Sequence, residues 1–262
     1  MELPKKAQKG EAGGMPEDFS LLLFGPPKIG KTTFGASFPD SLLIECEPKG
    51  ARYINGRVIN VGSLDELRDV FKLLKNDPGY CKTVVIDTLD RIAQWVEAEV
   101  CEDMGLSNIM ESKKGAKHGA QWAEYSHRIL TQLEGWKLLG KRVVFLAHTK
   151  KAEIDGEGLV ISPKTINLYG QAANRVLSIV ENVGHMYARK GDMNKPERVL
   201  SFAPGTVVEA GARHPLLADR VVVIGKENPY AALEGLFKPT AAAKTNGAKK
   251  LPKKKRKEAV GV

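Results

Sequence analysis

The chain has 262 residues, 42% of them hydrophobic, and a formal net charge of +9. This length and composition suit one domain with a sizeable core, and no apolar run approaches the roughly 18 residues that a membrane helix needs, which argues against a membrane protein. Three cysteines without paired spacing argue against a disulfide framework and a zinc site, and the N-terminus lacks the apolar segment of a signal peptide, so we expect a soluble intracellular protein.

The positive charge is concentrated near the C-terminus. From Thr240 onward there are eight Lys and Arg residues and one Glu, so this segment carries +7 of the +9 and leaves +2 for residues 1–239. A polyanionic partner would therefore contact the tail or a local patch on a nearly neutral body. Low apolar content predicts a flexible arm over 1–18 and a disordered basic tail over 239–262, on either side of one domain over 19–238.

The first predicted element is the apolar strand Leu21–Phe24, which is followed by a glycine-bounded loop and a short helix to about Ser37. The loop fits the spacing G-x-x-x-x-G-K-[ST], in which backbone N–H groups and the helix N-terminus attract phosphates, the lysine reaches the terminal phosphates and the hydroxyl coordinates Mg²⁺. We therefore predict a nucleotide site, the alternative being a Gly-Pro turn before a surface helix. Its residues are Gly25, Pro26, Pro27, Lys28, Ile29, Gly30, Lys31, Thr32 and Thr33.

A second buried strand is predicted over Ser41–Cys46, and it carries two carboxylates at its end. Side chains alternate along a strand, so Glu45 and Glu47 share one face at the carboxyl end, where α/β sheets bind ligands. Phosphoryl hydrolysis needs a group that orients the attacking water. We predict that both carboxylates line the cleft and that Glu47, which lies further out, is the base; a solvated carboxylate before a turn is the alternative.

Hydrophobic periodicity and turn signals predict the remaining elements. They are a strand over 57–61, a helix from a capping box at Ser63 and Glu66 to about Lys75, a strand over 83–87, a helix over 89–104, a helix with an aromatic stripe from Trp122 to Trp136, a strand over 142–147, a helix over 167–179, and a hairpin of 184–189 with 198–202. This order predicts an α/β fold with a mostly parallel central sheet flanked by helices and a C-terminal antiparallel hairpin. We interpret the aromatic stripe as core rather than as a stacking platform.

Two polar residues stand at the ends of later strands. Asp87 ends the strand over 83–87, and we predict that it shares a Mg²⁺ ion with Thr32, a helix cap being the alternative. His148 follows the strand over 142–147, where its side chain could contact the γ-phosphate; a buried structural histidine is an equally open alternative.

Two basic segments are candidates for nucleic-acid contact. Residues 112–119 are rich in lysine and glycine, and Lys150–Lys151 opens a second polar segment. Both are predicted to emerge at the same end of the sheet as the nucleotide, which favours contacts with phosphate groups over a plain solvated surface.

Together these motifs resemble the RecA-like P-loop ATPases, and more narrowly the phage-encoded single-strand annealing and recombination proteins with a lone RecA-type core. The similarity runs from about Ser20 to Phe237 and rests on the phosphate loop, Glu-Cys-Glu at 45–47, residues 84–87, the glycine and lysine loop before Trp122, and Phe145-Leu146-Ala147-His148. The resemblance implies that Glu47 activates water, Asp87 is the metal-linked acid, and His148 is the γ-phosphate sensor. Together with Lys31, which the phosphate-loop spacing assigns to the terminal phosphates, Glu47 and His148 are the predicted catalytic residues. It also implies that segments near 105–120 and 150–165 bind single-stranded DNA.

The resemblance further implies ATP and Mg²⁺ as cofactors, a ring or filament of identical subunits, and the cytoplasm of a bacterial host. A single-strand-binding protein or a recombinase would be a further partner. Such proteins often place a lysine and an arginine after the last hairpin to contact a neighbour's nucleotide, and here only Arg213 could do so.

Two other functions stay open from the residues alone. One is a small-molecule or nucleotide kinase, and the other is a non-enzymatic adaptor that loads other DNA proteins. The run Pro252–Lys257 looks like a nuclear-localisation signal, although we favour a DNA-binding arm.

Overall fold

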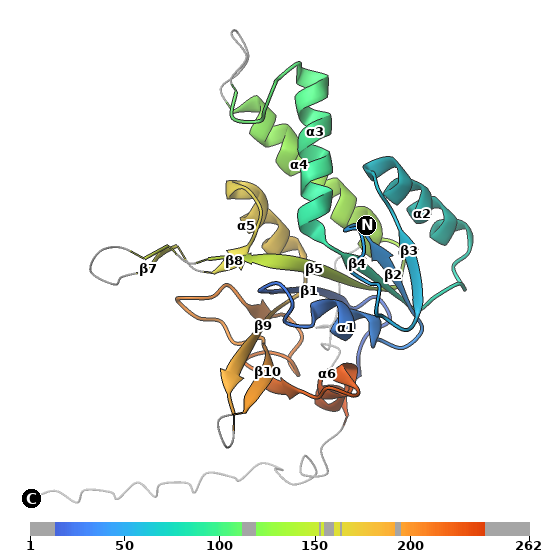
Figure 1. The fold of residues 1–262 in the computed structure, drawn as a ribbon, viewed down its shortest axis with the longest axis vertical. Helices are drawn as coiled ribbons and strands as arrows, with labels where there is room; N and C mark the ends of the chain where they lie inside the picture. Colours follow the sequence, from blue (N-terminus) through green and yellow to red (C-terminus); the bar gives the residue numbers. More distant parts are fainter. Residues whose placement is uncertain are drawn as a thin grey trace, which may run out of the picture.

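The computed structural model describes residues 14–111, 119–151, 153–154, 160–162, 164–191 and 195–238 (Figure 1). Most of the predicted N-terminal arm, the basic tail, the basic loop over 112–118 and the hairpin turn at 192–194 lie outside the described residues. The predictions made for those segments stay predictions.

The centre of the molecule is a ten-stranded sheet with the order β12-β10-β9-β1-β5-β4-β2-β3. The strands of this path are β1 (Ser20–Gly25), β2 (Ser41–Glu45), β3 (Arg57–Asn60), β4 (Thr83–Asp87), β5 (Arg142–Lys150), β9 (Asn182–Lys190), β10 (Pro196–Ser201) and β12 (Val221–Ile224). Neighbouring strands from β9 through β1, β5, β4 and β2 to β3 are parallel, whereas β10 runs antiparallel to both β9 and β12. The mostly parallel sheet and its C-terminal hairpin are therefore as predicted.

Four shorter strands complete the pattern. β8 (Thr165–Ile166) pairs with the end of β5, β11 (Gly211–Ala212) pairs with the start of β9, and β6 (Glu153–Ile154) pairs with β7 (Val160–Ser162). β5 is longer than predicted because its last residues pair with β8, and His148 thus lies within a strand rather than after one.

Helices cover both faces of the sheet and create two hydrophobic cores (Figure 1). α2 (Leu64–Asn76), α3 (Leu89–Met104), α4 (Ala120–Lys137) and α5 (Gly170–Ile179) pack on one face, and α1 (Lys31–Ala36) and α6 (Pro229–Phe237) pack on the other. No helix in the described ranges is long and apolar enough to cross a membrane.

Local sequence signals explain where some of these helices begin. The Ser63 side chain accepts a hydrogen bond from the Glu66 backbone N–H at 3.2 Å, and the Glu66 carboxylate accepts one from the Gly62 N–H at 2.7 Å. This arrangement confirms the predicted helix start, because both contacts satisfy N–H groups near the helix terminus. α5 begins three residues later than predicted, since Asn167 is held by a hydrogen bond from its N–H to the carbonyl of His148.

The aromatic stripe of α4 is core over most of its length. Tyr125 and Trp136 are buried, and the Trp136 ring meets Phe71 of α2 edge to face at 5.2 Å between centroids. Trp122 is only partly buried and contacts Tyr169, which precedes α5. The stripe is therefore mostly core, as predicted, and it packs α4 against α2 and against Tyr169 before α5.

Candidate nucleotide site

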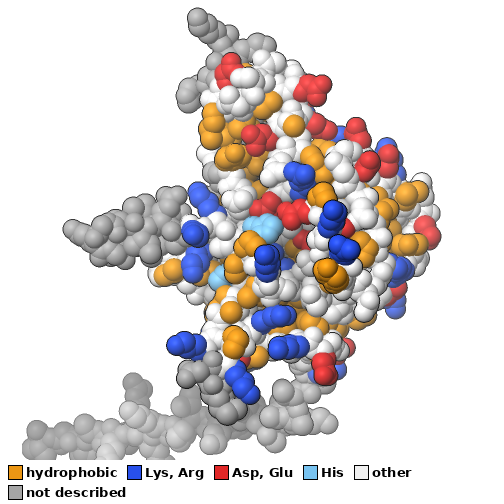
Figure 2. Space-filling model, in the orientation of Figure 1, with side chains coloured by type: hydrophobic (Ala, Val, Ile, Leu, Met, Phe, Trp, Pro, Cys, Tyr) orange, Lys and Arg blue, Asp and Glu red, His pale blue; other side chains and the backbone are white. Residues whose placement is uncertain are grey.

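The predicted site residues meet at one edge of the sheet, where the parallel strands β1, β4 and β2 end. The strand register places Gly25 beside His148, and it places Asp87 between Leu146 and Glu45. Figure 2 shows acidic side chains beside a histidine near the middle of one face, with lysine and arginine side chains below them, toward β9 and β10. Residues that are far apart in the sequence thus share one edge because parallel strands bring their carboxyl ends together.

The phosphate loop connects β1 to α1 and buries its lysine. Lys31 is only 5% exposed, and its Nζ donates hydrogen bonds to the carbonyl oxygens of Gly25 (3.0 Å) and Pro26 (3.1 Å). Burial lowers the pKa of Lys31, while the charges of Asp87, Asp90 and Glu47 oppose that shift. The ammonium group is therefore held inside its own loop by carbonyl groups that a phosphate could replace.

The rest of the loop is accessible and has an unusual backbone. Pro26, Pro27 and Lys28 are exposed, Ile29 and Gly30 are partly buried, and Thr33 is exposed in the first turn of α1. Gly30 has a φ of 105°, a conformation in which a residue with a Cβ is strained. This glycine lets the chain turn sharply from the loop into α1.

Thr32 and Asp87 form a direct contact. The Thr32 hydroxyl donates a hydrogen bond of 2.6 Å to the Asp87 carboxylate, which is 8% exposed. Burial raises the pKa of Asp87, and the bond from Thr32 and the charge of Lys31 counter it.

This pair suits a magnesium ion that is carried by a nucleotide. Mg²⁺ keeps several waters and usually takes one or two protein groups plus phosphate oxygens. Among the described residues, no group of three or more His, Cys, Asp or Glu side chains is placed to hold a metal by itself. One hydroxyl and one carboxylate side by side therefore fit the role predicted for Thr32 and Asp87.

Glu45, the last residue of β2, and Glu47, two residues later, differ in their surroundings. Glu47 accepts a hydrogen bond from the Thr88 hydroxyl at 3.0 Å, next to Asp87. Glu45 is 6% exposed, and its carboxylate accepts the Ala51 N–H at 2.5 Å. Both glutamates line one cavity, as expected, but the Glu45 carboxylate is engaged in a structural bond because the chain folds back over 47–51.

His148 is held by an aspartate that sequence reasoning missed. Its backbone N–H donates a 2.8 Å hydrogen bond to the Asp90 carboxylate, and its ring Nδ1 lies 3.4 Å from the same oxygen. The hydrogen bond with Asp90 raises the pKa of His148 against the effect of burial. Burial raises the pKa of Asp90, but the hydrogen bonds with His148 outweigh it and the net pKa is lowered. Asp90 stands in the first turn of α3, only three residues after Asp87, which is the signal that could have revealed it.

The His148–Asp90 pair predicts a pH-dependent contribution to stability. A histidine whose folded pKa exceeds its unfolded value of about 6.5 stabilises the fold fully below that value and loses this effect as the pH rises through the folded pKa. We expect His148→Gln to lose about 1 kcal/mol more of the free energy of unfolding at pH 6 than at pH 9. Denaturant unfolding across this range measures the difference, and Asp90→Asn should remove its pH dependence. If the difference in the free energy of unfolding between the wild type and His148→Gln stays constant from pH 6 to 9, the charge interaction between His148 and Asp90 is contradicted.

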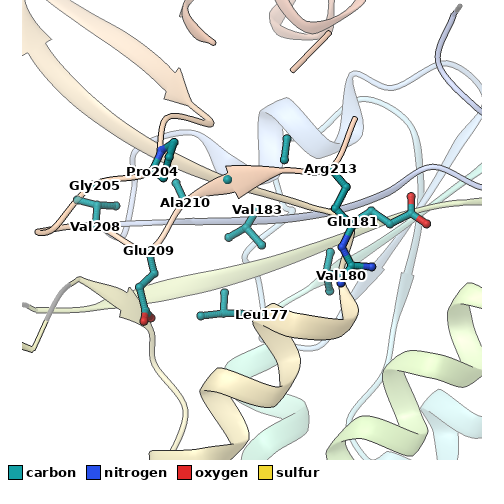
Figure 3. Close-up of a pocket in the computed structure, with 12 residues that line it drawn as sticks. Leu177, Val180, Glu181, Val183, Pro204, Gly205, Val208, Glu209, Ala210 and Arg213 are labelled. Atoms are coloured by element: carbon teal, nitrogen blue, oxygen red, sulfur yellow. The ribbon is translucent and has the colours of Figure 1, made fainter. Parts of the chain in front are cut away.

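Arg213 lies away from this edge. β11 pairs with the first residues of β9, at the amino ends of the parallel strands, and the Arg213 guanidinium donates a 2.6 Å hydrogen bond to the Ser178 carbonyl. Figure 3 shows it beside Glu181 at a cavity of about 510 Å³, with Leu177 and Val183 on the cavity wall. Arg213 therefore takes no part in the phosphate loop of its own chain.

A family profile described as an AAA domain matches residues 17–214. The chain belongs to the AAA domain family. This AAA domain spans the sheet from β1 to β11 and contains the phosphate loop, Glu47, Asp87 and His148. The predicted fold class, an α/β P-loop NTPase core, is confirmed, and the AAA domain is of a type that binds and hydrolyses nucleotides.

Two examples of proteins that are similar to this chain are a prophage protein and a solved structure. The SPbeta prophage-derived uncharacterized protein YorG of Bacillus subtilis (strain 168) is 24% identical over 153 residues, which cover 55% of this chain and 46% of that protein. The chain thus matches about half the length of this curated relative. The second is the KaiC-like protein PH0186 from the hyperthermophilic archaeon Pyrococcus horikoshii OT3, which has a crystal structure. The alignment covers 81% of this chain and 87% of the PH0186 chain, with 14% sequence identity and a TM-score of 0.48.

Proposed function

We propose that this AAA domain binds ATP together with Mg²⁺ and hydrolyses it. The observation that carries the proposal is the meeting of a buried lysine, a hydroxyl–carboxylate pair and a second carboxylate at one sheet edge, in Lys31, Thr32, Asp87 and Glu47. A P-loop enzyme needs these groups for phosphate binding, metal binding and orientation of water.

Each group has a distinct part in the reaction. Lys31 exchanges its bonds to loop carbonyls for bonds to the β- and γ-phosphates. Thr32 and Asp87 would hold the Mg²⁺ ion, which would supply positive charge to neutralise the phosphates. Glu47, steadied by the Thr88 hydroxyl, accepts a proton from the attacking water. His148 lies beside Gly25 on the neighbouring strand β5, and its raised pKa favours a protonated ring that would donate a hydrogen bond to the terminal phosphate.

The narrower function that we propose is an ATP-dependent single-strand DNA-binding protein of phage recombination or annealing, acting as a homo-oligomer. Its support is the resemblance to RecA-like annealing proteins, the prophage origin of the YorG relative, and the basic C-terminal segment. Lys150 ends β5 close to the site, so a bound strand there would be near the nucleotide.

The kinase alternative has less support. Kinases that share the phosphate loop close an arginine-rich lid over the phosphates, and residues 105–119 contain lysines but no arginine. Glu47 beside Asp87 also suits activation of water rather than recognition of a second substrate. The adaptor alternative differs only in lacking hydrolysis, so an activity measurement separates it.

The decisive test measures ATP hydrolysis with and without single-stranded DNA for the wild type and Lys31→Ala. We expect Mg²⁺-dependent hydrolysis that DNA increases, and a loss of at least about 100-fold in Lys31→Ala, because a phosphate-binding charge is removed. Lys72→Ala is the control, since Lys72 is an exposed lysine on α2 paired with Asp69.

Three outcomes contradict parts of the proposal. If the wild type does not hydrolyse ATP, the proposed ATPase activity is refuted and the non-enzymatic adaptor function is favoured. If hydrolysis does not respond to single-stranded DNA, the proposed role in recombination or annealing is refuted. Transfer of phosphate from ATP to nucleosides or nucleotides would favour the kinase function.

A further inference from the structure

Arg198 lies against the phosphate loop, although it comes from a strand distant in the sequence. It stands on β10, opposite Ala188 of β9 and Ile224 of β12. A Cβ built on Gly30 would lie 2.8 Å from Nη1 and 3.4 Å from Cζ of Arg198. The guanidinium group therefore covers the loop backbone immediately before Lys31.

The strands that carry this arginine are fixed to the loop by the core. β9 pairs with β1 up to the end of the strand, with Phe24 beside His185, and the Met186 carbonyl packs directly on Gly25. Val199 and Leu200, which follow Arg198, are fully buried. Arg198 thus has a defined position over the loop.

The positive charge of Arg198 has no carboxylate partner among the described residues. Arg189, on the neighbouring strand of the hairpin, has one. Arg189 of β9 pairs with Glu197 of β10 at 3.3 Å, whereas the Arg198 side chain forms no ion pair or hydrogen bond within the part of the chain that the structure describes. Arg198 is also partly buried. A partly buried, unpaired guanidinium over a phosphate loop is suited to an anionic ligand, because its planar donors match phosphate oxygens.

The sheet order indicates which phosphate this arginine meets. Asp87, Glu47 and His148 come from β4, β2 and β5, on one side of β1, so the metal, the water and the terminal phosphate belong on that side. Arg198 approaches from β9 and β10, on the other side of β1. A nucleotide that lies across the loop therefore turns its inner phosphates toward Arg198.

We propose that Arg198 binds the α- and β-phosphates of the nucleotide held by its own chain. This inference rests on the proposed nucleotide site, and it assigns Arg198 to binding rather than to the chemical step. ATP and ADP share these phosphates, so Arg198 contributes equally to the affinity of both.

The test compares Arg198→Gln with the wild type by calorimetric titration of ATP and ADP and by steady-state kinetics. We expect the affinities for ATP and ADP to fall by the same factor, about tenfold for a charge-assisted contact, with KM raised to match and kcat within about twofold. Arg198→Lys should recover part of the affinity because it keeps the charge. Arg189→Gln is the matched control on the same hairpin and should bind both nucleotides like the wild type.

The possible results separate this inference from the proposed function. If the wild type binds neither nucleotide, the nucleotide site itself is refuted. If the wild type binds and Arg198→Gln, shown to be folded by thermal unfolding, binds equally well, the role of Arg198 is refuted. A loss confined to ATP, or a fall in kcat at unchanged KM, would assign Arg198 to the terminal phosphate and overturn the contact with the inner phosphates.

Discussion

Glu47→Gln should slow ATP hydrolysis at saturating ATP by about 10²–10⁴-fold, the range for loss of a general base. ATP binding should persist, because Lys31 and the Thr32–Asp87 pair are unchanged and glutamine can still accept the hydrogen bond from Thr88. Single-turnover hydrolysis together with a binding titration measures the two effects separately. A variant that hydrolyses ATP at the wild-type rate would exclude Glu47 as the base.

Glu45→Gln is the matched comparison, since it makes the same chemical change two residues away. Glu45 is bound to the Ala51 N–H and should affect stability rather than chemistry. We expect the free energy of unfolding to fall by about 1–3 kcal/mol, the cost of weakening a buried hydrogen bond to a charged group. Hydrolysis by the folded fraction should continue. If Glu45→Gln instead abolished hydrolysis while Glu47→Gln did not, the assignment of the two carboxylates would be reversed.

Trp136→Ala should reduce the free energy of unfolding by about 3–5 kcal/mol, as expected for the loss of a large buried aromatic side chain. The indole is 2% exposed and packs against Phe71, so its removal leaves a cavity between α4 and α2. Leu138→Ala is the control, because Leu138 ends the same helix with its side chain 86% exposed. Guanidinium unfolding of both variants measures the difference, and equal effects would show that the stripe is not core.

The phosphate loop could be predicted because its spacing is local and its flanking strand and helix are visible in the sequence. The capping box at Ser63 and the strand that ends at Asp87 were predictable for the same reason. The position of Glu47 just beyond the carboxyl end of β2 could also be predicted from the order of residues along the chain. These features depend on residues within a few positions of one another.

Loop contacts and pairings between distant strands could not be predicted in this way. The structural hydrogen bond of Glu45 was missed because the chain after β2 folds back and offers it the Ala51 N–H. Asp90 depends on His148, which reaches it only when β5 forms beside β4. The extent of β5 depends on β8, and the position of Arg198 depends on three antiparallel strands. The last three features depend on strand pairing, which the sequence pattern alone does not specify.

The position of β1 has a consequence for how the protein opens. All six of its residues are buried, and β5 and β9 flank it on both sides. Amide hydrogens in such a central strand exchange with solvent only when the whole domain unfolds, whereas edge strands such as β3 and β12 exchange through local opening. The phosphate loop therefore follows β1, the strand whose hydrogen bonds break only on global unfolding. A nucleotide at 100 times its dissociation constant adds about 2.7 kcal/mol to global stability, and that gain protects the centre of the sheet rather than its edges.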